Sequence, residues 1–143
     1  MKTNARARAD QRSAPRVLVV DDSAGMRLYL CAILSTLQVS VVEADNGGAA
    51  FAEILASDFD LVITDLMMDK ADGFGLISAI SLLPNDRARP PVIVCSSLDP
   101  DSEAMQRPEL RLAKKILTKP VGATEVVEAV SKALGGLGTA SKA

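Results

Sequence analysis

The chain has 143 residues, of which 48% are hydrophobic and 24% are charged, a balance typical of one globular domain with a substantial core. No apolar run approaches the roughly 20 residues that span a bilayer, and no apolar stretch follows the basic N-terminus as in a secretory signal, so we expect a cytoplasmic protein without membrane contact. The net charge of −2 argues against direct DNA binding by the chain as a whole. The sequence has no histidine, which excludes histidine-based catalysis.

Residues 1–15 are predicted to be a disordered basic tail. Residues 1–16 contain five basic residues and only one acid, Asp10, and they lack the apolar content that a packed core needs. The alternative is a weak contact with an anion. One domain is predicted at residues 16–135, followed by a flexible C-terminal tail at residues 136–143.

Five short apolar runs are predicted as β-strands. Their residues are apolar almost continuously, which is typical of strands that are buried on both faces of a parallel sheet. The predicted strands are residues 16–20, 39–43, 61–64, 91–95 and 115–118.

A helical segment is predicted after each strand. The first one carries apolar residues from Met26 to Leu37 at helical spacing, and Asp72 is predicted to cap the third. Pro84 ends the third helix, and Pro108 ends a short fourth one. The predicted helices are residues 24–37, 48–56, 73–82, 100–106 and 123–134.

Strands that alternate with helices predict an α/β fold with a parallel sheet and helices on both faces. The carboxyl ends of such strands meet at one edge, where ligands bind. Five polar residues follow four of the predicted strands, namely Asp21, Asp22, Asp65, Ser96 and Lys119. Strands commonly end where polar residues begin, and this could explain any one of these residues. It does not readily explain why the whole set is chemically matched.

Three carboxylates at one edge repel each other and make ionisation costly, and a divalent cation removes that cost. Mg²⁺ prefers oxygen ligands and octahedral geometry. Asp22 and Asp65 are candidate direct ligands, Asp21 is a candidate ligand through water, and the backbone carbonyl of Met67 is a further candidate ligand.

The same edge has the groups for phosphoryl transfer. A carboxylate such as Asp65 can act as the nucleophile and form an acyl phosphate. Lys119 and Ser96 can then contact the phosphoryl oxygens, as a positive charge and as a hydroxyl donor. This chemistry depends mainly on positioning and charge neutralisation, so the lack of histidine is no obstacle to it.

These residues lie in blocks that resemble the receiver domain of two-component response regulators, in particular single-domain regulators of the chemotaxis type. The resemblance covers roughly residues 16–134. The matching blocks are VLVVDDS (17–23), Met26-Arg27, EADNG (43–47), LVITDLMM (61–68), Asp72-Gly73, PVIVCSS (91–97) and Lys119-Pro120.

The resemblance implies a flavodoxin-like, doubly wound sheet with strand order 2-1-3-4-5 and five helices. It also implies that Asp65 is the phosphoacceptor, that Asp21 and Asp22 bind the metal, that Ser96 and Lys119 contact the phosphoryl group, and that the Lys119–Pro120 bond is cis. The implied phosphoryl donor is a histidine kinase or a histidine phosphotransfer protein. The implied partner after phosphorylation is a downstream protein target, so the chain is expected to be a signalling phosphoprotein rather than an enzyme.

The sequence departs from the family pattern at several positions. Asp69 stands where the family usually has proline, and Ile116 stands where many receivers have an aromatic residue that rotates on activation. Met67 and Leu98, which flank the path of the hydrolytic water in this fold, are apolar, so we expect self-dephosphorylation to take minutes or longer. Tyr29, the only tyrosine, is interpreted as a half-buried packing residue.

The sequence leaves four alternative functions to consider. A phosphorelay shuttle that passes the group on to a histidine phosphotransfer domain is the main alternative, favoured by slow hydrolysis and by Ile116. An aspartyl-phosphate phosphatase requires a second acid where Met67 stands, and the complete acidic set argues against a pseudo-receiver. Asp21 and Asp22 would repel the phosphate of a flavodoxin-type cofactor.

Overall fold

The computed structural model describes residues 14–69 and 72–135, which form a five-stranded sheet with the order β2-β1-β3-β4-β5. All four strand pairs are parallel, so the predicted fold class and strand order are confirmed. Three strands have the predicted bounds, and β2 and β4 begin one residue later. The strands are β1 (Arg16–Val20), β2 (Ser40–Ala44), β3 (Leu61–Thr64), β4 (Val92–Ser96) and β5 (Lys115–Thr118).

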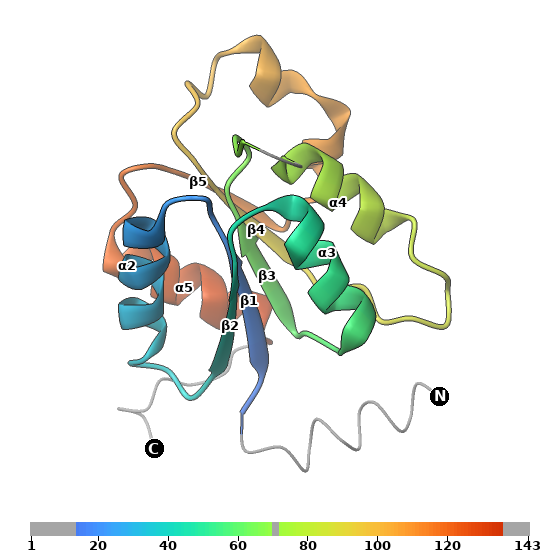
Figure 1. Ribbon diagram of the computed structural model, residues 1–143. Helices are drawn as coiled ribbons and strands as arrows, with labels where there is room; N and C mark the ends of the chain where they lie inside the picture. Colours follow the sequence, from blue (N-terminus) through green and yellow to red (C-terminus); the bar gives the residue numbers. More distant parts are fainter. Residues whose placement is uncertain (1–13, 70–71, 136–143) are drawn as a thin grey trace.

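Four α-helices cover the sheet in the described part of the chain. Figure 1 shows α2 and α5 on one face, and α3 and α4 on the other. None of the helices in residues 14–69 and 72–135 is long and apolar enough to cross a membrane. The helices are α2 (Ala24–Leu34), α3 (Gly47–Ala56), α4 (Gly73–Ser81) and α5 (Ala123–Ala133).

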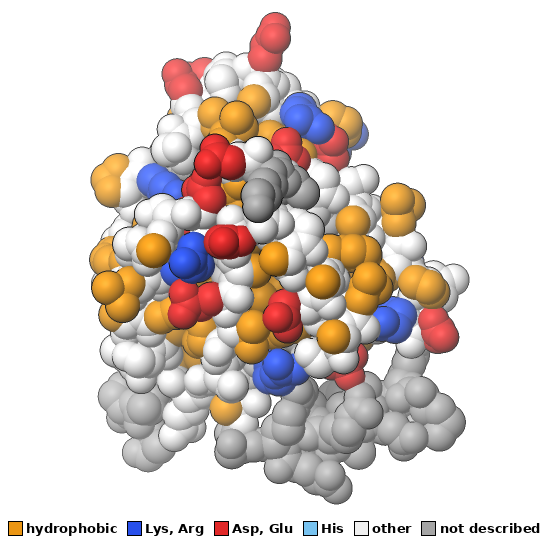
Figure 2. All heavy atoms as spheres, in the orientation of Figure 1, with side chains coloured by type: hydrophobic (Ala, Val, Ile, Leu, Met, Phe, Trp, Pro, Cys, Tyr) orange, Lys and Arg blue, Asp and Glu red, His pale blue; other side chains and the backbone are white. Residues whose placement is uncertain are grey.

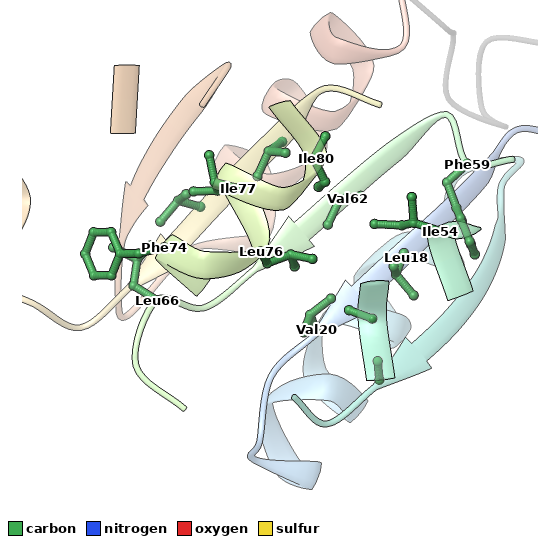
Figure 3. Close-up of a cluster of buried hydrophobic side chains, with 14 of the residues drawn as sticks. Leu18, Val20, Ile54, Phe59, Val62, Leu66, Phe74, Leu76, Ile77 and Ile80 are labelled. Carbon is green, nitrogen blue, oxygen red and sulfur yellow. The ribbon is translucent and has the colours of Figure 1, made fainter. Parts of the chain in front are cut away.

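Each face of the sheet has its own hydrophobic core because side chains alternate along a strand. In β1, Leu18 and Val20 pack on the side of α3 and α4, whereas Val17 and Val19 pack on the side of α2 and α5. Figure 3 shows the first core, in which strand residues meet Ile54 and side chains of α4. β3 and β4 are buried along their whole length, which explains their continuous apolar runs.

Three helices start beside the carboxyl edge of the sheet, and each is capped by a side chain. Ser23 accepts a hydrogen bond from the amide of Met26 at 3.1 Å, and Asn46 accepts one from Ala49 at 2.9 Å. Asp72 accepts one from Gly75 at 2.9 Å, as predicted for a cap. The caps satisfy backbone donors that a first helical turn leaves unpaired.

The predicted fourth helix is wrong as an α-helix. Between β4 and β5 the described chain has two short 3₁₀ helices, η1 (Glu103–Gln106) and η2 (Pro108–Leu112). Pro108 has no N–H and disfavours the helical conformation of the preceding residue, and Arg107 is accordingly extended, with φ −63° and ψ 139°. The guanidinium of Arg107 lies 4.0 Å from the centre of the Phe74 ring in α4, so the segment is held against the helical layer.

The predicted tails lie almost wholly outside the described residues, and their disorder stays a prediction. Residues 70–71 also lie outside the described residues. Within the described part, the Pro15 carbonyl accepts a hydrogen bond from the amide of Ser40 at 2.8 Å, which joins the start of β1 to β2.

Candidate functional site

The carboxyl edge of the sheet brings the predicted acidic residues together. Asp21 and Asp22 follow β1, and Asp65 follows β3. One carboxylate oxygen of each lies within 4.8 Å of the others. In Figure 2 several acidic side chains lie over the upper part of the molecule, where the strands of Figure 1 end. The candidate ligand atoms are all carboxylate oxygens, and they therefore fit a hard divalent cation such as Mg²⁺.

Lys119, the residue after β5, places its ammonium between two of these carboxylates. Its Nζ lies 2.9 Å from Oδ2 of Asp21 and 3.3 Å from Oδ2 of Asp65. The Lys119–Pro120 peptide bond is cis, as the resemblance implied. One ammonium faces three carboxylates, so the cluster keeps an excess of negative charge.

Backbone hydrogen bonds fix the direction of the two buried carboxylates. Oδ1 of Asp21 accepts from the amide of Ser23 at 2.9 Å, and Oδ1 of Asp65 accepts from the amide of Leu66 at 2.7 Å. The second oxygen of each acid is therefore the one that faces Lys119. Asp65 also continues the sheet ladder, because its amide donates to the carbonyl of Val20 at 3.0 Å.

Burial and charge act on the ionisation of the site. Burial raises the pKa of Asp65, the positive charge of Lys119 opposes this rise, and the negative charge of Asp21 adds to it. Burial would lower the pKa of Lys119, but the hydrogen bond with Asp21 and the charges of Asp65 and Asp21 outweigh it, so the pKa is raised. Ionised Asp65 is thus costly in this site without a further positive charge.

Ser96 ends β4 beside Lys119 and is 1% exposed. Its carbonyl accepts from the amide of Lys119 at 2.7 Å, and its hydroxyl oxygen accepts from the amide of Leu98 at 3.0 Å. The described residues show no hydrogen bond from this hydroxyl to Asp65, and its proton remains available for an incoming oxygen. The predicted set of five residues is therefore assembled, with Ser96 in contact with Lys119 through the backbone.

A comparison with protein families identifies the family of the chain. Residues 17–131 match the family model described as the response regulator receiver domain. The chain belongs to the response regulator receiver domain family. The match covers the acidic residues, Ser96 and Lys119, and agrees with a role in two-component signalling.

Known proteins similar to this receiver include the chemotaxis protein CheY of Bacillus subtilis, which is 34% identical over 85% of this chain and 98% of that protein. A gliding motility regulatory protein of Myxococcus xanthus is 42% identical over 58% of this chain. This chain matches only 11% of that longer protein, so the activities of the other regions of that protein are not attributed to this chain. The response regulator TrrA of Thermotoga maritima, solved with Mg²⁺ and BeF, is 26% identical and covers 84% of this chain and 99% of that one, with a TM-score of 0.74.

Gly73 also contributes to the receiver site, because a larger residue would clash with the backbone there. A Cβ at Gly73 would lie 2.1 Å from the carbonyl oxygen of Asp65 and 2.9 Å from Cα of Leu66. The Gly73 amide donates to the carbonyl of Leu66 at 3.0 Å. The start of α4 thus packs directly on the backbone that carries Asp65, and only glycine fits there. The sequence contained the Asp72-Gly73 pair but predicted only a turn and a cap.

Arg27 is a second contributor that the sequence pattern did not single out. Its Nη1 donates to the carbonyl of Asp21 at 2.7 Å, and its Nε pairs with Glu43 of β2 at 3.0 Å. Arg27 therefore fixes the backbone of the acidic loop to the edge strand. The available indication was its place in the Met26-Arg27 block of the family pattern.

The structure also describes Asp69 and Ile116, which depart from the family pattern, and the apolar residues Met67 and Leu98. Met67 and Asp69 are exposed, Leu98 is half-buried, and Ile116 is 36% exposed on β5 opposite Val94. The amide of Met67 lies 3.5 Å from Oδ1 of Asp65. The role of the Met67 carbonyl as a metal ligand stays a prediction.

Proposed function

We propose that this receiver accepts a phosphoryl group on Asp65 from the phosphohistidine of a histidine kinase or a histidine phosphotransfer protein, and that the modified surface binds a downstream protein target. The reaction is proposed to require Mg²⁺. The observation that supports this most strongly is the cluster of three carboxylates within 4.8 Å, with the Lys119 ammonium 2.9 Å from Asp21 and 3.3 Å from Asp65.

In the proposed step a carboxylate oxygen of Asp65 attacks phosphorus. An O–P bond forms while the N–P bond of the donor breaks, and the electron pair of that bond returns to the imidazole nitrogen. Asp22, Asp65 and the Met67 carbonyl would hold Mg²⁺ directly and Asp21 would hold it through water, and the ion would supply positive charge for the phosphoryl oxygens. Oδ1 of Asp65 is engaged by the amide of Leu66, so Oδ2 is the proposed attacking atom.

The proposed switch is electrostatic. A phosphoryl group brings about −1.5 to −2 charges and three acceptor oxygens. Lys119 can contact one of these oxygens if it leaves the longer of its two ion pairs, the one with Asp65 at 3.3 Å. The Ser96 hydroxyl can donate to another, which moves the loop that starts at Leu98 and shifts an existing equilibrium.

A phosphorelay shuttle is the second candidate. The apolar side chains of Met67 and Leu98 cannot orient a hydrolytic water. Ile116 is aliphatic and has no hydroxyl, so it cannot give the rotation-coupled signal of the aromatic residue that many receivers have at this position. A long-lived phosphoryl group suits a shuttle, and a phosphate-release assay tests the expected lifetime of minutes or longer. Pull-downs with and without beryllofluoride and Mg²⁺ separate the two functions, because a switch gains partners only with the mimic, whereas a shuttle binds its phosphotransfer partner in both states.

The proposal is tested by incubating the full chain with acetyl phosphate and following its mass. We expect the gain of one phosphoryl group with Mg²⁺ and none with EDTA. Asp65→Asn should abolish the gain, because an amide oxygen cannot form the acyl phosphate. Asp45→Asn, which changes an exposed acid at the same edge, should leave it intact. Mg²⁺-dependent labelling that persists in Asp65→Asn would identify another acceptor and overturn the assignment.

A further inference from the structure

Tyr29 makes a specific contact between two segments that are far apart in the sequence. Its hydroxyl donates a hydrogen bond of 2.6 Å to the carbonyl of Val121. Tyr29 lies on α2, and Val121 lies two residues beyond Lys119. The side chain of Tyr29 remains 41% exposed, so it fills little of the core, and the expectation of a purely packing residue misses its polar contact.

The contact completes a pair of anchors around Lys119. On the near side, the Lys119 amide donates to the Ser96 carbonyl at 2.7 Å. On the far side, Pro120 has no N–H to donate, and the carbonyl of the residue after it, Val121, accepts from the Tyr29 hydroxyl. Lys119 and Pro120 are thus fixed at one end to β4 and at the other end to α2.

The helix that carries Tyr29 is also tied to the acidic half of the site. The Ser23 amide donates to Oδ1 of Asp21 and the Ser23 hydroxyl oxygen caps α2. Arg27 of α2 donates to the carbonyl of Asp21. One short helix therefore contacts both the loop of Asp21 and the loop that follows Lys119.

We propose that Tyr29 is a positioning residue that places Lys119 for contact with the phosphoryl group. This inference rests on the proposed function. Tyr29 does not touch the reacting atoms and acts through the backbone from Val121 to Lys119. Its effect should therefore appear in steps that use the ammonium of Lys119, and be absent from steps that use only the carboxylates.

Tyr29→Phe tests this because it removes only the hydroxyl. Calorimetric titration measures the affinity for Mg²⁺ alone and then for beryllofluoride in saturating Mg²⁺. We expect beryllofluoride to bind about fivefold more weakly, as for the loss of one hydrogen bond, with Mg²⁺ affinity unchanged. Ser35→Ala is a matched control, since its hydroxyl donates to the Ala32 carbonyl at the other end of α2, and it should change neither affinity.

Unfolding by urea checks that both variants are folded under the titration conditions. Unchanged beryllofluoride affinity in Tyr29→Phe would overturn the positioning role, as would a fall shared equally by Mg²⁺ and beryllofluoride. Failure of the unmodified chain to bind beryllofluoride in Mg²⁺ would instead overturn the proposed function, and the positioning role with it.

Discussion

Lys119 is shared between two carboxylates, and this sharing is the main feature of the site at the scale of single residues. Asp21 is 1% exposed and Asp65 is 7% exposed, so both charges are removed from most of their water. One ammonium 2.9 Å and 3.3 Å away cannot neutralise both acids and Asp22 as well. The residual repulsion favours any added positive charge, and it makes the ionisation of Asp65 costly when no cation is bound.

Asp65→Asn should therefore stabilise the fold in the absence of Mg²⁺. Because the fold raises the pKa of Asp65, ionisation destabilises the folded state. This cost is absent below the ordinary carboxyl pKa, grows as the pH rises to the raised pKa and is constant above it. In EDTA we expect a gain in the free energy of unfolding at pH 7 and almost none at about pH 3. Urea unfolding measures both, and a loss of stability at pH 7 would contradict this account.

The polar residues at the strand ends could be predicted from the sequence, whereas the contacts of the residues that hold their backbone in place could not. Asp21, Asp65 and Lys119 follow apolar runs directly, and parallel strands share one carboxyl edge. Arg27 and Tyr29 act through hydrogen bonds to backbone carbonyls. Such partners depend on how helices pack on the sheet, and no spacing in the sequence encodes them.

At the scale of elements, the junction between β3 and α4 controls the position of Asp65. Asp65 is anchored to β1 by its amide, and the first residue of α4 lies against its carbonyl. The helix starts there because Asp72 caps it. Helix and acid therefore cannot move independently at this point.

Gly73→Ala should disturb this junction. The new Cβ would lie 2.1 Å from the Asp65 carbonyl oxygen, and relief requires a shift of α4 or of the Asp65 backbone. We expect a loss of about 2 kcal/mol in the free energy of unfolding, typical of overpacking, and slower labelling by acetyl phosphate. Gly75→Ala is the control, because its Cβ would make only an ordinary contact of 3.5 Å with Asp72. Equal stability of the two variants would show that the junction tolerates the methyl group.

The elements were predictable where apolar pattern and caps agree. The strands follow their apolar runs to within one residue, and Asp72 marks the start of α4. The segment between Pro100 and Pro108 was not predictable in detail. Proline indicates where a helix ends, but it does not distinguish one short α-helix from the two 3₁₀ helices found here.

At the scale of the whole molecule, a parallel sheet between two helical layers gathers the site from distant parts of the chain. The alternation of strands and helices predicted this architecture, and the receiver pattern supplied the strand order. Three carboxylates at one edge are an electrostatic cost to the fold. The central claim is that a divalent cation offsets this cost and prepares Asp65 for phosphorylation.

The dependence of folding stability on Mg²⁺ tests that claim most directly. An ion that binds only the folded chain stabilises it progressively above its dissociation constant. Urea unfolding should therefore show a free energy of unfolding that rises with the logarithm of the Mg²⁺ concentration. The rise should be much smaller in Asp22→Asn, which removes an exposed carboxylate without disturbing the core. A free energy of unfolding in the unmodified chain that does not respond to Mg²⁺ would contradict the account.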